Sequence, residues 1–345
     1  MAFLRIVAKL LIFRWDYCEM NSKKAVIFDH DGGIDDLLSL LLLLRLPNIE
    51  VIGVSITPAD CYPDDALIST KKILTLSGNT HIPVCVGNIT GPNPFPPEWR
   101  AQPKICHAMP LMLRTPNDDV TVVNECAHQW MRHVIASHPS NVTVIMTGPA
   151  TNLVAAINCP EKGAQVKNNI DRVIWMGGAV DVKGNVAMHD HNGTAEWNAY
   201  WHPKATHQLV HSGLDVMLVP LDATNSLPVS WEFLNALAEK QTAVSDLAGQ
   251  FWAATVTAIP SYEFTYFLWD VLSVCAIALP QDKFTTNTGK ITVATSTPNA
   301  GQTYRDDTLG ADITWMSWVD AEYVRQMVIH YLSGDFKTLP VTYVN

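Results

Sequence analysis

The stretch AVIFDHDGGIDDLLSLLLLL, residues 25–44, joins a short apolar run to a longer one through a cluster of aspartates. Ala25–Phe28 is short, apolar and followed by acidic residues, which predicts a buried strand. Asp35–Leu46 predicts a helix that ends before Pro47, because the residue before a proline disfavours helical conformation. Leu37–Leu44 is interrupted only by Ser39, so we expect this helix to be buried. A buried strand leading into a buried helix is typical of an alternating α/β fold.

The same alternation continues along the chain. Short apolar runs predict further strands at Val51–Ile56, Val142–Met146, Val173–Trp175 and Val216–Val219. Helices are predicted at Asp64–Ser77 and Tyr323–Leu332. This order predicts an α/β fold with a largely parallel open sheet flanked by helices, a Rossmann-like core. Ligands in such folds bind beyond the carboxyl ends of the strands.

Length and composition favour one domain, because the 345 residues contain no internal repeat and no low-complexity linker. We expect residues 21–345 to form this domain and residues 1–20 to be an extension outside the fold. A targeting peptide is the alternative for that extension. Met1–Phe13 is apolar but contains Arg5 and Lys9 and is too short to span a bilayer, so no membrane association is expected.

Charge and cysteine usage exclude other classes of protein. The formal net charge of −10 disfavours a nucleic acid polymer as partner, although it leaves a neutral nucleoside open. The seven cysteines show no CxxC spacing, which predicts reduced thiols and a cytoplasmic location, with no disulfide framework and no zinc knuckle.

Three segments are predicted as long loops, and such loops often act as functional lids. They are Asn88–Pro110, Asp181–Thr194 and Ala253–Leu268. His189 and His191 fall in the second loop, where no third ligand supports a zinc site, so we expect them to be solvated.

Four aspartates fall within eight residues at the end of the first predicted strand. Such crowding is costly unless a cation neutralises it, and hard oxygen ligands suit Ca²⁺ or Mg²⁺. Acidic side chains also interact favourably with the N-terminus of a helix, but this role would account only for Asp35 and Asp36. An EF-hand loop starting at Asp29 would need a glutamate where Leu40 stands. A phosphatase of the haloacid-dehalogenase type is the main rival, because it also places Asp-x-Asp-Gly after an apolar strand.

The remaining motifs favour a different family. The spacing of Asp29, Asp31, Asp35 and Asp36 resembles the signature of the inosine–uridine nucleoside hydrolases. Met146–Asn152, Met176–Ala179, Glu196–Asn198 and Trp269-Asp270 are similar to further motifs of that family and occur in its order. Asp29–Gly32 and the tryptophan before Asp270 resemble the branch that prefers inosine, adenosine and guanosine. A calcium-binding protein of the same fold without activity is a further alternative.

This resemblance implies a calcium cofactor and a catalytic base. Ca²⁺ would be held by Asp31, Asp36, Asp270 and the backbone carbonyl of Thr147. A calcium-bound water would be the nucleophile, with Asp31 as the general base. The ion would also chelate the ribose diol, and Asp35 would accept a hydrogen bond from the sugar.

The resemblance also implies the residues that contact the rest of the substrate. Asn185, Glu196 and Asn198 would bind sugar hydroxyls, and Asp60 matches a substrate-contacting position. Glu196 and Asn198 are two residues apart, so they would share one side of an extended segment.

Trp99 and Trp269 are expected to stack on the base from its two faces, which predicts purine ribonucleosides as substrates. A broad or pyrimidine specificity is the alternative. Gly33 departs from the asparagine of the purine-specific relatives, and Ala253–Leu268 contains no cationic side chain. A homodimer is also expected.

Overall fold

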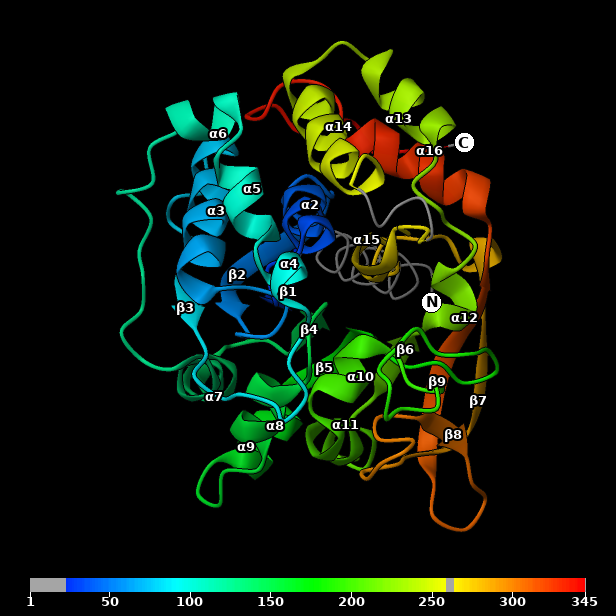
Figure 1. Cartoon of the computed structure of the whole chain (residues 1–345). Coiled ribbons are helices and arrows are strands. Elements are labelled where there is room, and N and C mark those ends of the chain that lie inside the picture. Colours follow the sequence, from blue (N-terminus) through cyan, green and yellow to red (C-terminus); the bar gives the residue numbers. More distant parts are fainter. Residues whose placement is uncertain (1–22, 259–263, 345) are drawn as a thin grey trace, which may run out of the picture.

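The computed structural model describes residues 23–258 and 264–344, which fold around a sheet of nine strands in the order β3-β2-β1-β4-β5-β6-β9-β7-β8 (Figure 1). The strands are β1 (Lys24–His30), β2 (Ile49–Ile56), β3 (Val84–Val86), β4 (Val142–Met146), β5 (Ile170–Met176), β6 (Val216–Val219), β7 (Phe284–Val293), β8 (Thr303–Arg305) and β9 (Ala311–Val319). The predicted extension, residues 1–20, lies outside the described residues.

The sheet is parallel from β3 through β6 to β9, and β7 is antiparallel to both β8 and β9. The predicted α/β fold with a largely parallel sheet is therefore confirmed. The antiparallel edge was not predicted, because the first half of β7 is rich in threonine and exposed rather than apolar.

Helices cover both faces of the sheet (Figure 1). They are α2 (Ile34–Leu43), α3 (Pro63–Leu76), α4 (Pro97–Arg100), α5 (Gln102–His107), α6 (Pro110–Arg114), α7 (Ala127–Ser137), α8 (Thr151–Ile157), α9 (Gly163–Asn168), α10 (Trp197–Trp201), α11 (Pro203–Val210), α12 (Leu221–Thr224), α13 (Trp231–Ala238), α14 (Ala243–Val256), α15 (Trp269–Cys275) and α16 (Ala321–Tyr331), with a 3₁₀ turn at Gln281–Lys283.

Successive residues of β1 enter different cores. Val26 and Phe28 pack with α2, α3 and α13 to α16, whereas Ile27 packs with α7, α8, α9 and α11. This alternation follows from the period of two in a strand, and burial on both sides makes β1 continuously apolar.

The predicted loops have different outcomes. Asp181–Thr194 contains neither a helix nor a strand, as predicted. The prediction was wrong for Asn88–Pro110, which contains α4 and α5, and for the start of Ala253–Leu268, which is the last turn of α14. Short helices that begin at or near a proline, such as α4 and α5, carry too little apolar periodicity to be seen in sequence. In the described part of the chain, no helix is long and apolar enough to cross a membrane.

The strand order places a crevice beyond the carboxyl end of β1. β1 lies between β2 and β4, and the chain runs outward to one side first and to the other side later. Side chains that follow β1, β2, β4 and β5 therefore converge at this point, which is where open α/β sheets bind ligands.

Candidate active site

The turn between β1 and α2 brings its aspartates together. Gly32 adopts a φ of +87°, and a Cβ there would lie 2.7 Å from Cys61 Cβ. Glycine is the residue that tolerates both conditions. The turn places Asp31 just before the helix, and Asp35 and Asp36 in its first turn.

Three carboxylates form a compact group. Oxygens of Asp35, Asp36 and Asp270 all lie within 4.8 Å of one another, and all three residues are buried. Burial, followed by the charge of Asp35, raises the pKa of Asp36 to about 7. Burial, and then the charges of Asp35 and Asp36, also raise the pKa of Asp270. This all-oxygen group therefore fits a hard divalent cation, which would neutralise its charge.

Asp31 adjoins this group without belonging to it. Its backbone N–H donates to Asp36 Oδ1 at 3.3 Å, and the backbone N–H of Asp60 donates to its Oδ2 at 3.2 Å. Burial, and then the charges of Asp36 and Asp60, raise the pKa of Asp31. The sequence prediction included Asp31 among the cation ligands, whereas the compact group contains Asp35 in its place.

Thr147 connects the end of β4 to the carboxylates. Its hydroxyl donates to Asp36 Oδ1 at 2.5 Å, and its backbone N–H donates to the carbonyl of Asp29 at 2.9 Å. The next residue, Gly148, lies against Asp31, because a Cβ there would be 2.7 Å from Asp31 Cβ. The Met146–Asn152 motif thus packs directly on the turn between β1 and α2.

Glu196 and Asn198 do not share one side of an extended segment, so that prediction was wrong. Glu196 is the N-cap of α10, and its carboxylate accepts from the backbone N–H groups of Asn198 at 2.8 Å, Ala199 at 3.1 Å and Gly178 at 3.0 Å. A helix N-terminus leaves such N–H groups unsatisfied, and a capping carboxylate satisfies them. Burial raises the pKa of Glu196 to about 7.

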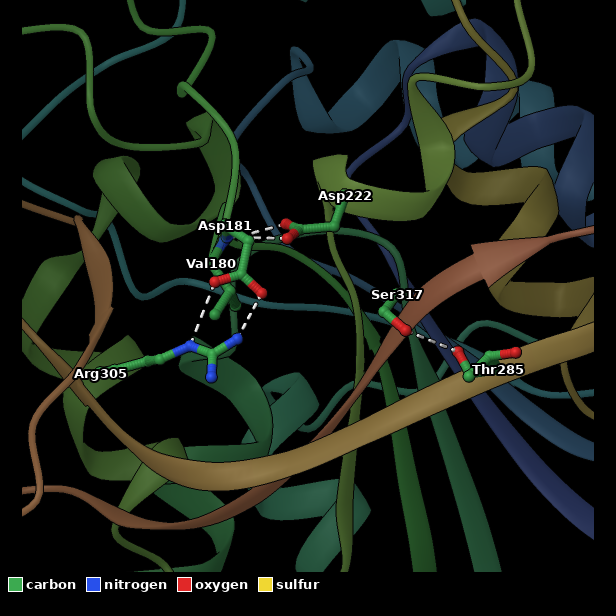
Figure 2. A network of polar contacts seen from close by, with 6 residues as sticks. All are labelled: Val180, Asp181, Asp222, Thr285, Arg305 and Ser317. Carbon is green, nitrogen blue, oxygen red and sulfur yellow. Dashed lines mark hydrogen bonds and ion pairs between the residues drawn. The ribbon is translucent and has the colours of Figure 1, made fainter.

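The loop that carries Asn185 is anchored at its start (Figure 2). Asp222 of α12 accepts from the backbone N–H groups of Val180 at 2.9 Å and Asp181 at 2.7 Å. The guanidinium of Arg305 in β8 binds the Asp181 carboxylate through two hydrogen bonds. Figure 2 also shows the hydroxyl of Ser317 directed at the carbonyl of Thr285, at 3.3 Å, which joins β9 to β7. The antiparallel edge of the sheet therefore supports the loop that carries Asn185.

Aromatic side chains form one wall of the site. Phe264 bridges the two predicted tryptophans, with ring centroids 6.2 Å from Trp99 and 5.9 Å from Trp269. Tyr266 packs against Trp269 and donates its hydroxyl to Asp35 Oδ1 at 2.7 Å. Sequence reasoning missed Phe264 and Tyr266, although both fall in Ala253–Leu268, which was predicted to be a functional loop.

One cavity of about 310 Å³ brings all the predicted residues together. Its lining includes Asp31, Asp35, Asp36, Asp60, Trp99, Thr147, Asn185, Glu196, Asn198, Trp269 and Asp270. Among the described residues that line it there is no histidine, lysine or arginine. The cavity therefore combines an acidic floor with aromatic walls, and its described lining offers no cationic side chain.

Comparison with known proteins identifies relatives of this arrangement. A family model described as inosine-uridine preferring nucleoside hydrolase matches residues 26–327. The pyrimidine-specific ribonucleoside hydrolase RihA of Citrobacter koseri is 28% identical over 224 residues, which are 60% of this chain and 63% of that protein, so less than two thirds of RihA is spanned. Uridine nucleosidase 1 of Arabidopsis thaliana is 24% identical over 303 residues, 84% of each chain. The crystal structure of an inosine-uridine preferring nucleoside hydrolase from Bacillus anthracis has a TM-score of 0.80 and 32% identity, covering 88% of this chain and 97% of that chain.

Proposed function

Because the chain belongs to the inosine-uridine preferring nucleoside hydrolase family, we propose that it hydrolyses the N-glycosidic bond of purine ribonucleosides to free base and ribose, in purine salvage. The observation that carries this proposal is the cavity itself, whose acidic floor faces aromatic walls without a histidine, lysine or arginine in the described lining. The carboxylates of the floor can bind a cation and the hydroxyls of a ribose, and the aromatic side chains of the walls can stack on a purine.

Calcium fits the carboxylate group. The proposed ligands are the carboxylates of Asp31, Asp36 and Asp270 and the carbonyl of Thr147, with Asp35 close enough to take part. When bound, Ca²⁺ supplies a Lewis acid that lowers the pKa of a water molecule and attracts the oxygens of a vicinal diol.

The polar side chains that line the cavity would carry out proton transfer and bind the sugar. Asp31 accepts the proton of the attacking water, since its buried carboxylate lines the cavity beside the carboxylate group proposed to hold the ion. Asp35 and Asp60 accept hydrogen bonds from the substrate. Asn185, Glu196 and Asn198, which all line the same cavity, hold the other sugar hydroxyls.

The walls promote departure of the base. Without an imidazolium or another cation in the described lining, protonation of the base has to be favoured by other means. Stacking on the electron-rich rings of Trp99 and Trp269 stabilises a purine whose imidazole nitrogen carries a proton. The purine can then leave as a neutral molecule.

Pyrimidine specificity is the second candidate function. It is favoured by the relatives, since RihA of Citrobacter koseri is described as pyrimidine-specific and the Arabidopsis protein as a uridine nucleosidase. Against it stands Trp269, which cannot donate a proton to the base of uridine, uracil, which itself lacks a basic ring nitrogen.

A nucleoside panel tests both candidates. The full chain, freed of metal with a chelator and supplied with either Ca²⁺ or Mg²⁺, is incubated with inosine, adenosine, guanosine, uridine and cytidine, and free base and reducing sugar are measured. We expect calcium-dependent release of base from the three purine nucleosides and slow release from the pyrimidines. Equal or faster cleavage of uridine would establish the second candidate in place of the first.

The cysteines agree with the proposed cytoplasmic location. The six described cysteines are all free, as is usual in a reducing compartment.

A further inference from the structure

The helical segment α4–α5 presents one face to the cavity. Glu98 of α4 and Gln102 and Ile105 of α5 all line it, and the spacing of three residues places the last two on one side of α5. Glu98 and Ile105 are exposed at the rim, whereas Gln102 is half-buried and reaches the start of α2.

A hydrogen bond fixes the orientation of the Gln102 amide. The backbone N–H of Ile34 donates to Gln102 Oε1 at 3.1 Å. Because an N–H group can only donate, the oxygen rather than the nitrogen of the amide has to face Ile34. This contact therefore settles which of the two amide positions is the oxygen and which is the nitrogen. The Nε2 group therefore points elsewhere, and no residue in the described ranges accepts a hydrogen bond from it.

The same contact places this donor near the sugar end of the cavity. Ile34 is the first residue of α2 and directly precedes Asp35, which Tyr266 contacts. Gly33, on the other side of Ile34, has no side chain to fill the space, and its missing Cβ would face carboxylate oxygens of Asp36, Asp35 and Asp60 at 3.0, 3.2 and 3.4 Å. Gln102 therefore lines the cavity next to the turn whose carboxylates are proposed to bind the ribose.

We propose that Gln102 Nε2 donates a hydrogen bond to the acceptor of the base that neighbours the glycosidic nitrogen, which is N3 of a purine or O2 of a pyrimidine. This rests on the proposed function, since it requires a nucleoside in the cavity. As the glycosidic bond breaks, its electron pair moves onto the base, so a donor at this acceptor binds the transition state more tightly than the substrate. Gln102 is thus a specificity-determining residue that recognises the sugar-side edge of the base.

Two substitutions separate recognition of the base from capping of α2. Gln102→Glu keeps an oxygen that can accept from Ile34 and removes the donor. Gln102→Met keeps a similar length and removes both groups. The measurement is kcat/KM of the calcium-loaded full chain for adenosine, for 3-deazaadenosine, which has C–H in place of N3, for uridine, and for 4-nitrophenyl β-ribofuranoside, which has no base. Thermal unfolding of each variant reports the capping role.

We expect the ratio of kcat/KM for adenosine to that for 3-deazaadenosine to fall by about tenfold in both variants, the usual worth of a hydrogen bond to a group that gains charge. The ratio of adenosine to the aryl riboside should fall with it, which excludes a general disturbance of the carboxylates by the new charge. Unchanged ratios in both variants, with only Gln102→Met unfolding at a lower temperature, would show that Gln102 is merely a cap.

The same measurements distinguish failure of the proposed function from failure of the proposed role of Gln102. If the wild type cleaves uridine and the aryl riboside but not adenosine, the purine assignment is wrong. The ratio of uridine to the aryl riboside then decides the role of Gln102, and it should still fall in both variants. An unchanged ratio overturns the role of Gln102.

Discussion

The side-chain amide of Asn198 donates a hydrogen bond to the backbone carbonyl of Thr147 at 2.8 Å. The same nitrogen lies 3.2 Å from the carbonyl of Met176. Asn198 therefore joins the ends of β4 and β5 to α10. Because the Thr147 carbonyl is a proposed calcium ligand, this bond links the position of a ligand to the residues proposed to hold the sugar.

Replacing Asn198 should weaken the calcium site as well as the substrate site. In Asn198→Ala the Thr147 carbonyl loses a buried partner that holds it in place, a loss of about 1 kcal/mol or more. We expect the free calcium concentration for half-maximal activity to rise by about tenfold, measured from initial rates in calcium buffers. Asn299→Ala, which removes an amide bonded to Gln302 instead, is the matched control. An unchanged calcium dependence would show that Asn198 acts on the sugar alone.

The proposed general base can be tested without changing shape. Asp31→Asn keeps the volume of the side chain but cannot accept a proton at pH 7. We expect kcat to fall by roughly 10²–10⁴-fold, the usual contribution of a general base. The amount of calcium bound per chain, measured by atomic absorption, distinguishes loss of the general base from loss of the calcium ion. Asp312→Asn, at an exposed ion pair with Lys290, serves as the control. Near-normal kcat with calcium bound would remove Asp31 from the mechanism.

Much of the fold was predictable where burial is complete. Val142–Met146 and Val216–Val219 were predicted to the residue, because central parallel strands are apolar on both faces. Phe284–Val293 was missed because its first half is exposed at the edge of the sheet and so has no apolar pattern. Patterns of hydrophobicity indicate which strands are buried. They do not predict a strand that pairs with its neighbours while its side chains stay exposed.

The site was predictable only in part for a similar reason. Residues within contiguous motifs, such as Asp31 and Asp36, were predicted from the sequence and line the cavity. Tyr266 and Gln102 were not, because each reaches the site through a contact between distant segments, with Asp35 and Ile34 respectively. No local spacing encodes such a contact.

The stability of the metal-free chain should depend on pH in an unusual direction. Burial raises the pKa of Asp36 from 3.8 to about 7 and that of Glu196 from 4.5 to about 7. Between these limits the folded state binds more protons than the unfolded state, so the free energy of unfolding falls as pH rises from about 4 to about 7. We therefore expect a lower Tm at pH 8 than at pH 5.5, by about 2 °C or more.

Calcium supplies the control for this prediction. The ion stabilises the ionised carboxylates that bind it, so saturating Ca²⁺ should raise Tm most at pH 8 and reduce the difference, leaving the part due to Glu196. Asp36→Asn removes one of the titrating groups, and its metal-free form should show a smaller dependence on pH. Differential scanning calorimetry at both pH values measures all three samples. A metal-free Tm that rises from pH 5.5 to pH 8 would contradict the prediction.

The purine preference should depend on the two tryptophans. Stacking on an aromatic side chain is worth about 1–3 kcal/mol per base, and a purine offers a larger face than a pyrimidine. Trp269→Ala should lower kcat for inosine as well as affinity, because base protonation develops in the transition state. Trp99→Ala should also reduce the ratio of kcat/KM for inosine to that for uridine. Trp231→Ala, on the exposed face of α13, is the control. If both cavity variants retain the full purine preference of the wild type, the tryptophans are structural and do not determine the preference.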